Sequence, residues 1–432
     1  MHFILLAVLS ALLILSSPAG AGEHTVSLQE AYDLALKNHE SVKIAGEVLY
    51  QLEQTRKKAV SNILPVITAD GSYTKYSEEK ISTSLDNVIQ PDNSLNYSLR
   101  LSLPLYRGGR EWSALRQARH LIEAGERGSE ITKEDVVSAV SYAYMGRLKL
   151  QKEIEIKEAD LKRAEEWSRV ASAKFRVGEV TRAAVLRADA EAAGIQADLS
   201  RVKKELHIAE DRLARLIGVQ SGFDIEEPPQ KDVPDGKVEE LILTALNNRN
   251  DYLKTNAEVE LAKEGIRYAR GGFMPTLRLD GVYSGRDQDP VSSAFFNKES
   301  IYASITLTYP LYEGGLRVAE VSEAESKFRE AGLKKIILAK EIELEVRDAS
   351  YNIDAIKSAI EFYRTQVSFA EENYNTVFKQ FTYGLAVNAD VIDANSTLVA
   401  AQSSLSNSTI DLQLAIIELK KRMGLLLDDE GI

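Results

Sequence analysis

The chain contains one six-residue segment twice in nearly the same form. PLYRGG occupies positions 104–109 and PLYEGG occupies positions 310–315, which is 206 positions later (310 − 104). The same offset separates Gly178 from Gly384. A period of this length far exceeds the about 20–50 residues of a solenoid repeat, so it indicates duplication of a whole domain. The predicted parts are a first repeat over 22–218, a linker over 219–236, a second repeat over 237–424 and a C-terminal tail over 425–432.

Long stretches without proline follow both copies of this segment. None of the ten prolines lies between Pro104 and Pro228, and none follows Pro310. Because proline breaks helix interiors, these stretches permit very long helices. The first repeat is expected to begin with a helix, and each repeat to contain a helix of about 100 Å paired with a second helix. The predicted helices cover 110–177, 179–218, 316–383 and 386–424.

Apolar residues in the second long helix are spaced as in a coiled coil. They recur at steps of three and four from Ile353 to Phe381, and the pattern resumes from Val391 to Leu405. A sustained heptad pattern predicts a left-handed supercoil against a partner helix. The glycine between the paired helices, Gly178 or Gly384, then predicts a tight turn with positive φ.

Four other segments alternate apolar and polar residues as β-strands do. They lie at about 64–76, 96–106, 275–284 and 301–311, with aromatic residues near their ends. One such strand alone would fit a soluble sandwich better, but four of them beside very long helices favour transmembrane strands. Four strands cannot close a barrel, and an open edge in lipid leaves backbone groups unsatisfied. We therefore expect an α+β membrane protein in which three copies complete a twelve-stranded barrel.

The repeated segment is expected at the corner where a strand ends and a long helix begins. Pro104 and Pro310 would end strand pairing there. The glycines that follow would let the backbone swing without a Cβ in the way. These corner glycines are Gly108, Gly109, Gly314 and Gly315.

The first 21 residues are interpreted as a signal peptide. Residues 3–15 are apolar except for Ser10, and Ala19, Gly20 and Ala21 form a small-residue cleavage pattern. A membrane anchor would need about 20 apolar residues, more than this segment has. Beyond it, no apolar run is long enough for a helical span, so membrane insertion would depend on the strands.

Composition excludes several classes of function. A net charge of −12 argues against a nucleic-acid partner, because no basic excess neutralises phosphates. The absence of cysteine excludes disulfides and thiolate metal sites, the histidines are scattered, and no catalytic or cofactor motif occurs. We therefore expect no enzyme activity, no cofactor and no metal. A secreted or periplasmic coiled-coil protein without a pore is the alternative; it would explain the heptads but not the strands or the glycine corners.

The corner and turn motifs together resemble the TolC-type outer-membrane efflux family. LPLYRGG and TYPLYEGG are followed in order by KFRVGEVTRAAVLRADAE and QFTYGLAVNADVIDANST, and the likeness covers essentially the whole mature chain. The resemblance implies a homotrimer in the outer membrane of a Gram-negative bacterium, with its barrel in lipid and a helical tunnel in the periplasm. It implies an exit duct of a tripartite efflux or type I secretion system. The partners would be a periplasmic adaptor (a membrane fusion protein) and an inner-membrane transporter, with drugs, metal ions or polypeptides as cargo.

The resemblance also assigns roles to residues near the helix turns. The turns around Phe175, Gly178, Phe381 and Gly384 would meet the adaptor. Asp390 and Asp393 match an aspartate pair at the tunnel constriction; three copies would form carboxylate rings that favour cations. Judged from the residues alone, both are ordinary exposed helix acids.

Three positions depart from the family pattern near these turns. Ala184 replaces an acidic residue, Ala386 a basic one, and Phe381 a tyrosine. The closed-state latch of some family members is therefore expected to be absent or rebuilt, with Arg176 and Arg182 as candidates. The lack of cysteine also removes the acylated N-terminus of many members, so anchoring would rest on the barrel.

Overall fold

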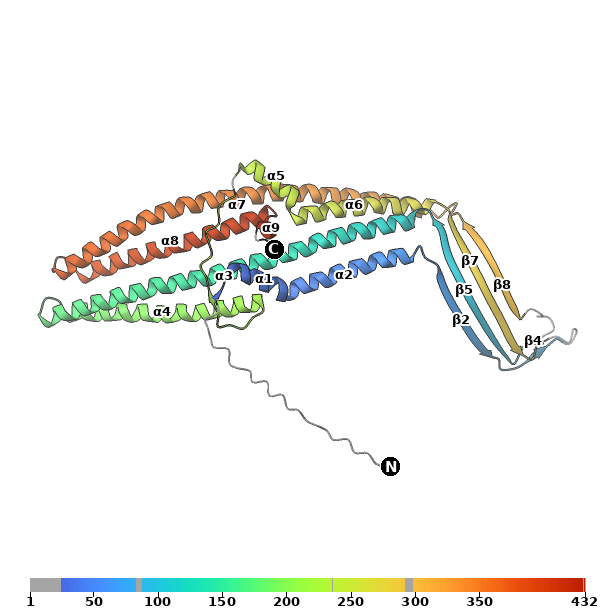
Figure 1. Ribbon diagram of the computed structural model, residues 1–432, viewed down its shortest axis with the longest axis horizontal. Helices are drawn as coiled ribbons and strands as arrows, with labels where there is room; N and C mark the ends of the chain where they lie inside the picture. The colour runs from blue at the N-terminus through green and yellow to red at the C-terminus, as the bar shows by residue number, and fades with distance from the viewer. Residues whose placement is uncertain (1–24, 83–87, 235, 292–297, 430, 432) are drawn as a thin grey trace, which may run out of the picture.

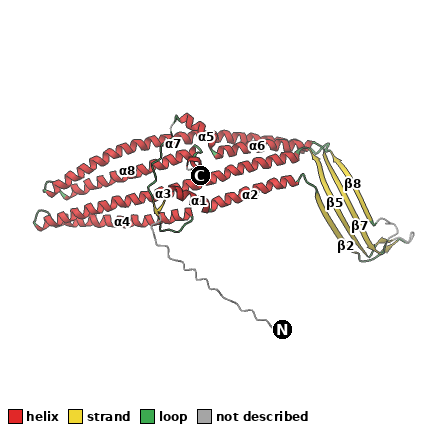
Figure 2. Cartoon of the chain, viewed as in Figure 1, coloured by secondary structure: helices red, strands yellow, loops and turns green. Residues whose placement is uncertain are grey.

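The computed structural model describes residues 25–82, 88–234, 236–291, 298–429 and 431. The chain forms a long rod of roughly parallel helices with a β-sheet at one end (Figure 1). The rod consists of helices, and the long strands lie together at one end of the molecule (Figure 2). The predicted signal peptide over residues 1–21 lies outside the described residues.

Two helices of equal length run along the rod. α3 spans Arg110–Arg176 and α7 spans Leu316–Thr382, each of 67 residues. α4 (Arg182–Ile217) packs along α3, and α8 (Asn388–Arg422) packs along α7. These two helical hairpins end together, far from the sheet (Figure 1). The nine predicted seam positions from Ile353 to Phe381 are all buried or half-buried, as a coiled coil requires.

Shorter helices complete the rod on the side of the sheet. α2 packs on α3, and α6 packs on both α3 and α7. The linker region contributes a two-residue strand that pairs with the start of the described chain, and residues 425–432, predicted as a tail, contain a short helix. These elements are α1 (Leu28–Asn38), α2 (Glu40–Ser61), α5 (Val238–Asn248), α6 (Asn250–Arg270), the 3₁₀ turn η1 (Gly271–Phe273), α9 (Leu426–Asp429), and the parallel pair β1 (Thr25–Val26) and β6 (Asp224–Ile225).

The sheet has four long antiparallel strands in the order β2-β5-β7-β8. Its central ladder joins β5 of the first half to β7 of the second half. The strands are β2 (Val66–Lys75), β5 (Asn93–Arg107), β7 (Thr276–Asp289) and β8 (Glu299–Thr308); beside them β3 (Lys80–Ile81) pairs with β4 (Val88–Gln90). β7 runs five residues past its predicted end at 284, and β8 ends three residues before its predicted end at 311.

The register gives the sheet one apolar and one mainly polar face. Leu101 stands opposite Ile67 on β2 and Gly281 on β7, and Leu279 stands opposite Ile305 on β8. Since side chains alternate along strands, the neighbours of these residues fall on the other face. The apolar face carries Ile67, Leu99, Leu101, Tyr283, Ile301 and Ile305, and the other face carries Asp70, Ser98, Arg100, Asp280, Ser284 and Arg286.

The rod has a central hydrophobic cluster where α3 meets α1, the end of α4 and the β1–β6 pair. Tyr144, near the midpoint of α3, is fully buried in it. Its single O–H is shared between the carbonyl oxygens of Val26 (2.9 Å) and Glu226 (2.7 Å). Burial raises the pKa of Tyr144 to about 12, so the hydroxyl keeps its proton at physiological pH. This one side chain therefore ties the start of the described chain and the linker to α3.

We expect Tyr144→Phe to destabilise the protein by about 1–3 kcal/mol, because the buried Val26 carbonyl and the Glu226 carbonyl lose the donor that they share. Thermal unfolding followed by helical circular dichroism would measure the effect. Tyr142→Phe is the control, since Tyr142 is exposed and its hydroxyl makes only a long contact of 3.4 Å to Glu418. Equal losses in the two variants would contradict the anchoring role of Tyr144.

Candidate functional site

Both hairpin turns use the same backbone motif. Gly178 has φ 80° and Gly384 has φ 78°, so the predicted positive φ is confirmed at both. In the first turn the Gly178 N–H donates to the Phe175 carbonyl (3.0 Å) and the Glu179 N–H to the Lys174 carbonyl (2.9 Å). This pair of bonds is a Schellman motif, and the turn at Gly384 repeats it.

The turns expose apolar side chains at the end of the rod. Val177, Tyr383, Leu385 and Val387 are all exposed there, and Phe175 is partly exposed. Phe381 lies on the predicted heptad seam, but it does not fit the predicted adaptor contact, because it is only 2% exposed and packs inside the cluster that joins the two hairpins. Its position on the coiled-coil seam explains this burial, so it supports the turn from within and offers no contact surface.

Asp390 and Asp393 lie on exposed positions of the first two turns of α8. The Asp390 carboxylate accepts a hydrogen bond from the Val387 N–H at 2.9 Å. Asp390 therefore caps the start of α8, a role that was not predicted from the sequence. The signal was present, since an acid in the first turn of a predicted helix favours such a bond.

Polar side chains link the two hairpins near their turns. Trp167 of α3 donates from Nε1 to Asn388 Oδ1 (2.7 Å), and Asn388 Nδ2 donates to the Ala184 carbonyl (2.8 Å). Further along, Arg163 donates to Asn395 Oδ1 (2.8 Å), and Asn395 donates to the buried Asp160 carboxylate (2.7 Å). These links were not predicted from the sequence. Its available signal was two asparagines seven residues apart, next to a heptad seam.

The strand-to-helix corners differ from the prediction at their prolines. Pro104 lies inside β5, where the ladder with β7 shifts register between Pro104 and Tyr106 and then continues to Arg107. The prediction that Pro104 ends the pairing is therefore wrong. β2 pairs with β5 only as far as Ser102, so beyond that residue β5 has a paired neighbour on one side alone. The bulge in this part of β5 accommodates the missing N–H of Pro104. Pro310 follows the end of β8 at Thr308.

The corner glycines adopt the left-handed conformation expected of them. Their φ values are 71°, 77°, 61° and 87° for Gly108, Gly109, Gly314 and Gly315. Gly108 also packs against the second half, because a Cβ there would overlap the Gly271 carbonyl oxygen and lie 2.9 Å from Met274 Cβ. A Cβ on Gly109 would meet no atom within 4 Å. The first corner thus fits into the junction between α6 and β7.

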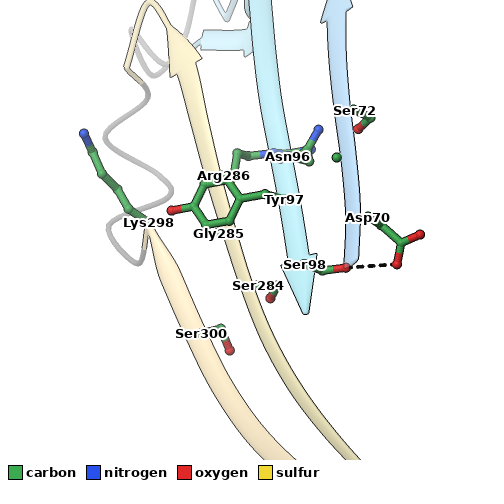
Figure 3. A pocket seen from close by; sticks show the side chains of 11 residues that line it. Asp70, Ser72, Asn96, Tyr97, Ser98, Ser284, Gly285, Arg286, Lys298 and Ser300 are labelled. Carbon is green, nitrogen blue, oxygen red and sulfur yellow. Dashed lines mark hydrogen bonds between the residues drawn. The ribbon is translucent and has the colours of Figure 1, made fainter. Parts of the chain in front are cut away.

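A shallow polar pocket lies on the sheet near its free end (Figure 3). Asp70 and Ser98 form a 3.5 Å hydrogen bond, and Arg286 donates to Asn96 at 2.9 Å. Among the described residues, no group of three or more His, Cys, Asp or Glu side chains could hold a metal ion. No described helix combines the length and hydropathy needed to cross a membrane.

A rod of paired long helices that carries an amphipathic sheet defines an elongated channel-type subunit. The chain belongs to the Outer membrane efflux protein family, whose sequence model matches residues 31–219 and again residues 241–425. It is therefore an outer-membrane protein of efflux and secretion systems and not an enzyme.

Individual relatives agree with this assignment. Outer membrane protein TolC of Vibrio cholerae is 24% identical over 416 residues, which cover 94% of this chain and 92% of that protein. Alkaline protease secretion protein AprF of Pseudomonas aeruginosa is 22% identical over 93% of this chain and 85% of its own length. A crystal structure of CusC, described in connection with folding and transmembrane channel formation, superposes on this chain with a TM-score of 0.81 at 18% identity. The superposition covers 95% of each chain.

We expect Gly108→Ala to destabilise the protein more than Gly109→Ala. Both changes place a side chain in the left-handed region at a cost of about 1–2 kcal/mol. Only Gly108→Ala adds an overlap with the α6–β7 junction, for which we expect about 1–3 kcal/mol more. Thermal unfolding of the two variants side by side measures the difference; equal midpoints would show that the corner does not depend on this close approach.

Proposed function

We propose that three copies of this chain form the exit duct of a tripartite efflux or type I secretion system. The observation that carries the proposal is the amphipathic four-stranded sheet, whose outer strands β2 and β8 pair on one side only among the described residues. In lipid, the backbone groups along these edges need partners. The β5–β7 ladder joins the two halves of one chain, so β8 pairing with β2 of the next copy would continue the same alternation.

Three copies would supply twelve strands, enough for a barrel with a water-filled interior. Ile301, Ile305 and Leu307 are largely exposed on β8, and the apolar face that they share would turn to lipid. The opposite face, with Asp70, Arg100 and Arg286, would line the water-filled interior. The separation of an apolar face from a polar face argues against a coiled-coil protein without a pore, because such a protein would not need an amphipathic sheet.

The helical rod would carry the duct through the periplasm. A helix of 67 residues is about 100 Å long, so α3 and α7 of three copies would enclose a tunnel of that length. The exposed apolar residues at the turns support docking of a periplasmic adaptor there, which would connect the tunnel to an inner-membrane transporter. Phe175, Gly178 and Gly384 belong to this docking end.

Asp390 and Asp393 would form acidic rings just inside the docking end of the tunnel. Their exposure on the first turns of α8 supports this role. Three carboxylates in a narrow opening favour cations and oppose anions. The water-filled tunnel itself would discriminate little among cargo molecules. The selection among drugs, metal ions and polypeptides would therefore be made by the transporter.

We expect the purified protein to be a trimer in detergent and to conduct small cation-selective steps in a planar bilayer. The double variant Asp390→Asn with Asp393→Asn should lose most of the cation preference, because the rings lose their charge. Asparagine retains an oxygen that accepts from the Val387 N–H, so α8 keeps its cap. Light scattering gives the mass, and reversal potentials in a salt gradient give the selectivity.

The control for this experiment is Asp211→Ala, an exposed acid on α4 far from the turns. It should leave both the trimer and the selectivity unchanged. Unchanged selectivity in the double variant would show that these aspartates do not form the constriction. A monomer without conductance would contradict the duct itself.

A further inference from the structure

The polar pocket near the free end of the sheet is formed within a single chain. Its volume is about 550 Å³, and residues of β2, β5 and β7 and the start of β8 line it. Hydroxyl, amide and charged side chains make up most of this lining (Figure 3). The pocket is therefore large enough for a small polar ligand and offers mainly hydrogen-bonding groups to it.

The strand register places these polar side chains in two rows on the same face. The row nearer the helices consists of Asp70, Ser98, Ser284 and Ser300. The row nearer the free end consists of Ser72, Asn96, Arg286 and Lys298. Residues between the rows alternate to the opposite face, where the Tyr97 ring covers Gly285 (Figure 3). The short serine side chains leave the hollow, and the longer basic side chains border it.

The charge around the pocket is mainly positive. Among the described residues that line it, Arg286 and Lys298 are basic and Asp70 is acidic. Arg100 adds a further positive charge on the same face, two residues along β5 from the serine row. Asp70 stands on β2, two and three strands away from the two basic lining residues, which is about 10–14 Å. The pocket therefore has a basic side on β7 and β8.

Both basic side chains are placed to contact a ligand. Arg286 donates from Nε to Asn96 Oδ1 at 2.9 Å, which orients its guanidinium group beside the pocket. Lys298 Nζ lies 3.9 Å from the Asp287 carboxylate, and both of these side chains are mostly exposed. Such an exposed ion pair is weak, so an anionic ligand can compete for the ammonium group.

We propose that this pocket binds multivalent oxyanions. Arg286 and Lys298 supply the charged donors, and the hydroxyl groups of Ser284 and Ser300 donate to the same oxygens. Guanidinium, ammonium and hydroxyl donors together suit phosphate groups or clustered carboxylates, because charge-assisted hydrogen bonds to such oxygens are the strongest that these side chains form. Since one chain supplies the whole pocket, binding does not require the proposed trimer.

The position of the pocket within a duct does rest on the proposed function. There it would lie at the mouth of the barrel, at the opposite end from the acidic rings of Asp390 and Asp393. Three copies would place three basic pockets around the mouth. An anionic group on a cargo molecule would be repelled at the docking end and attracted at the mouth. The barrel would therefore have a charge preference opposite to that of the docking end.

Calorimetric titration of the detergent-purified full chain with inorganic triphosphate tests the proposal. We expect saturable binding with one site per chain, which weakens as sodium chloride is raised. The double variant Arg286→Gln with Lys298→Gln should bind about tenfold more weakly or worse, because both charged donors are lost. Asp70→Asn should bind about two- to fivefold more tightly, because it removes the acid and keeps an acceptor for Ser98.

Two controls accompany these variants. Lys75→Gln removes an exposed basic residue of β2 that the register places on the opposite face, and it should leave the affinity unchanged. Maltotriose, a neutral ligand rich in hydroxyl groups, should give no binding heat. The gain expected for Asp70→Asn is the decisive result, since a poorly folded variant cannot bind more tightly than the natural chain.

The outcomes distinguish the pocket from the duct. Equal triphosphate affinities in the natural chain and both pocket variants would overturn the oxyanion site, and so would equal binding of maltotriose. Light scattering in the same detergent gives the mass of the particle. A trimer that binds no triphosphate would overturn the pocket and leave the duct intact, whereas a monomer that binds it would support the pocket and contradict the duct.

Discussion

The rest of the structure depends on how the backbone N–H and C=O groups along the outer edges of β2 and β8 are satisfied. In the described part of the chain each of these strands pairs on one side only, and at the proposed position in the membrane no water would satisfy the other side. A four-stranded sheet is too narrow to close on itself. A single chain therefore leaves surfaces that further copies would cover. These surfaces include the edges of β2 and β8 and also the exposed apolar faces of α7 and α4.

Stability along the rod is distributed over separate clusters and not held in one core. One cluster lies at the hairpin turns around Trp167 and Phe381, and two lie at mid-rod around Tyr144 and around Ile416. Long helices can support this arrangement because each cluster needs only its local neighbours. The turns can therefore change their packing without unfolding the middle, which would suit the docking role proposed for this end.

Local patterns predicted the long helices, the four strands and the positive-φ glycines, because heptads, alternation and proline spacing are visible in the chain itself. Features that depend on which elements become neighbours were not predictable in this way. The bulge at Pro104 exists because β2 stops at Ser102. The bonds of Asn388 and Asn395 exist because α8 lies against α3. The burial of Phe381, in contrast, follows from its place on the predicted heptad seam. The family resemblance predicted a tunnel constriction at Asp390 and Asp393 but did not reveal that Asp390 caps α8.

The anchoring of β1 at the middle of the rod has a practical consequence for handling the protein. Thr25 and Val26 are pinned beside Tyr144, about halfway along α3 and away from both the sheet and the turns. A label or affinity tag inserted just before Thr25 would leave the surface at mid-height. It would obstruct neither opening of a duct, and it would provide a fixed reference point for measuring how far the rod reaches from the outer membrane.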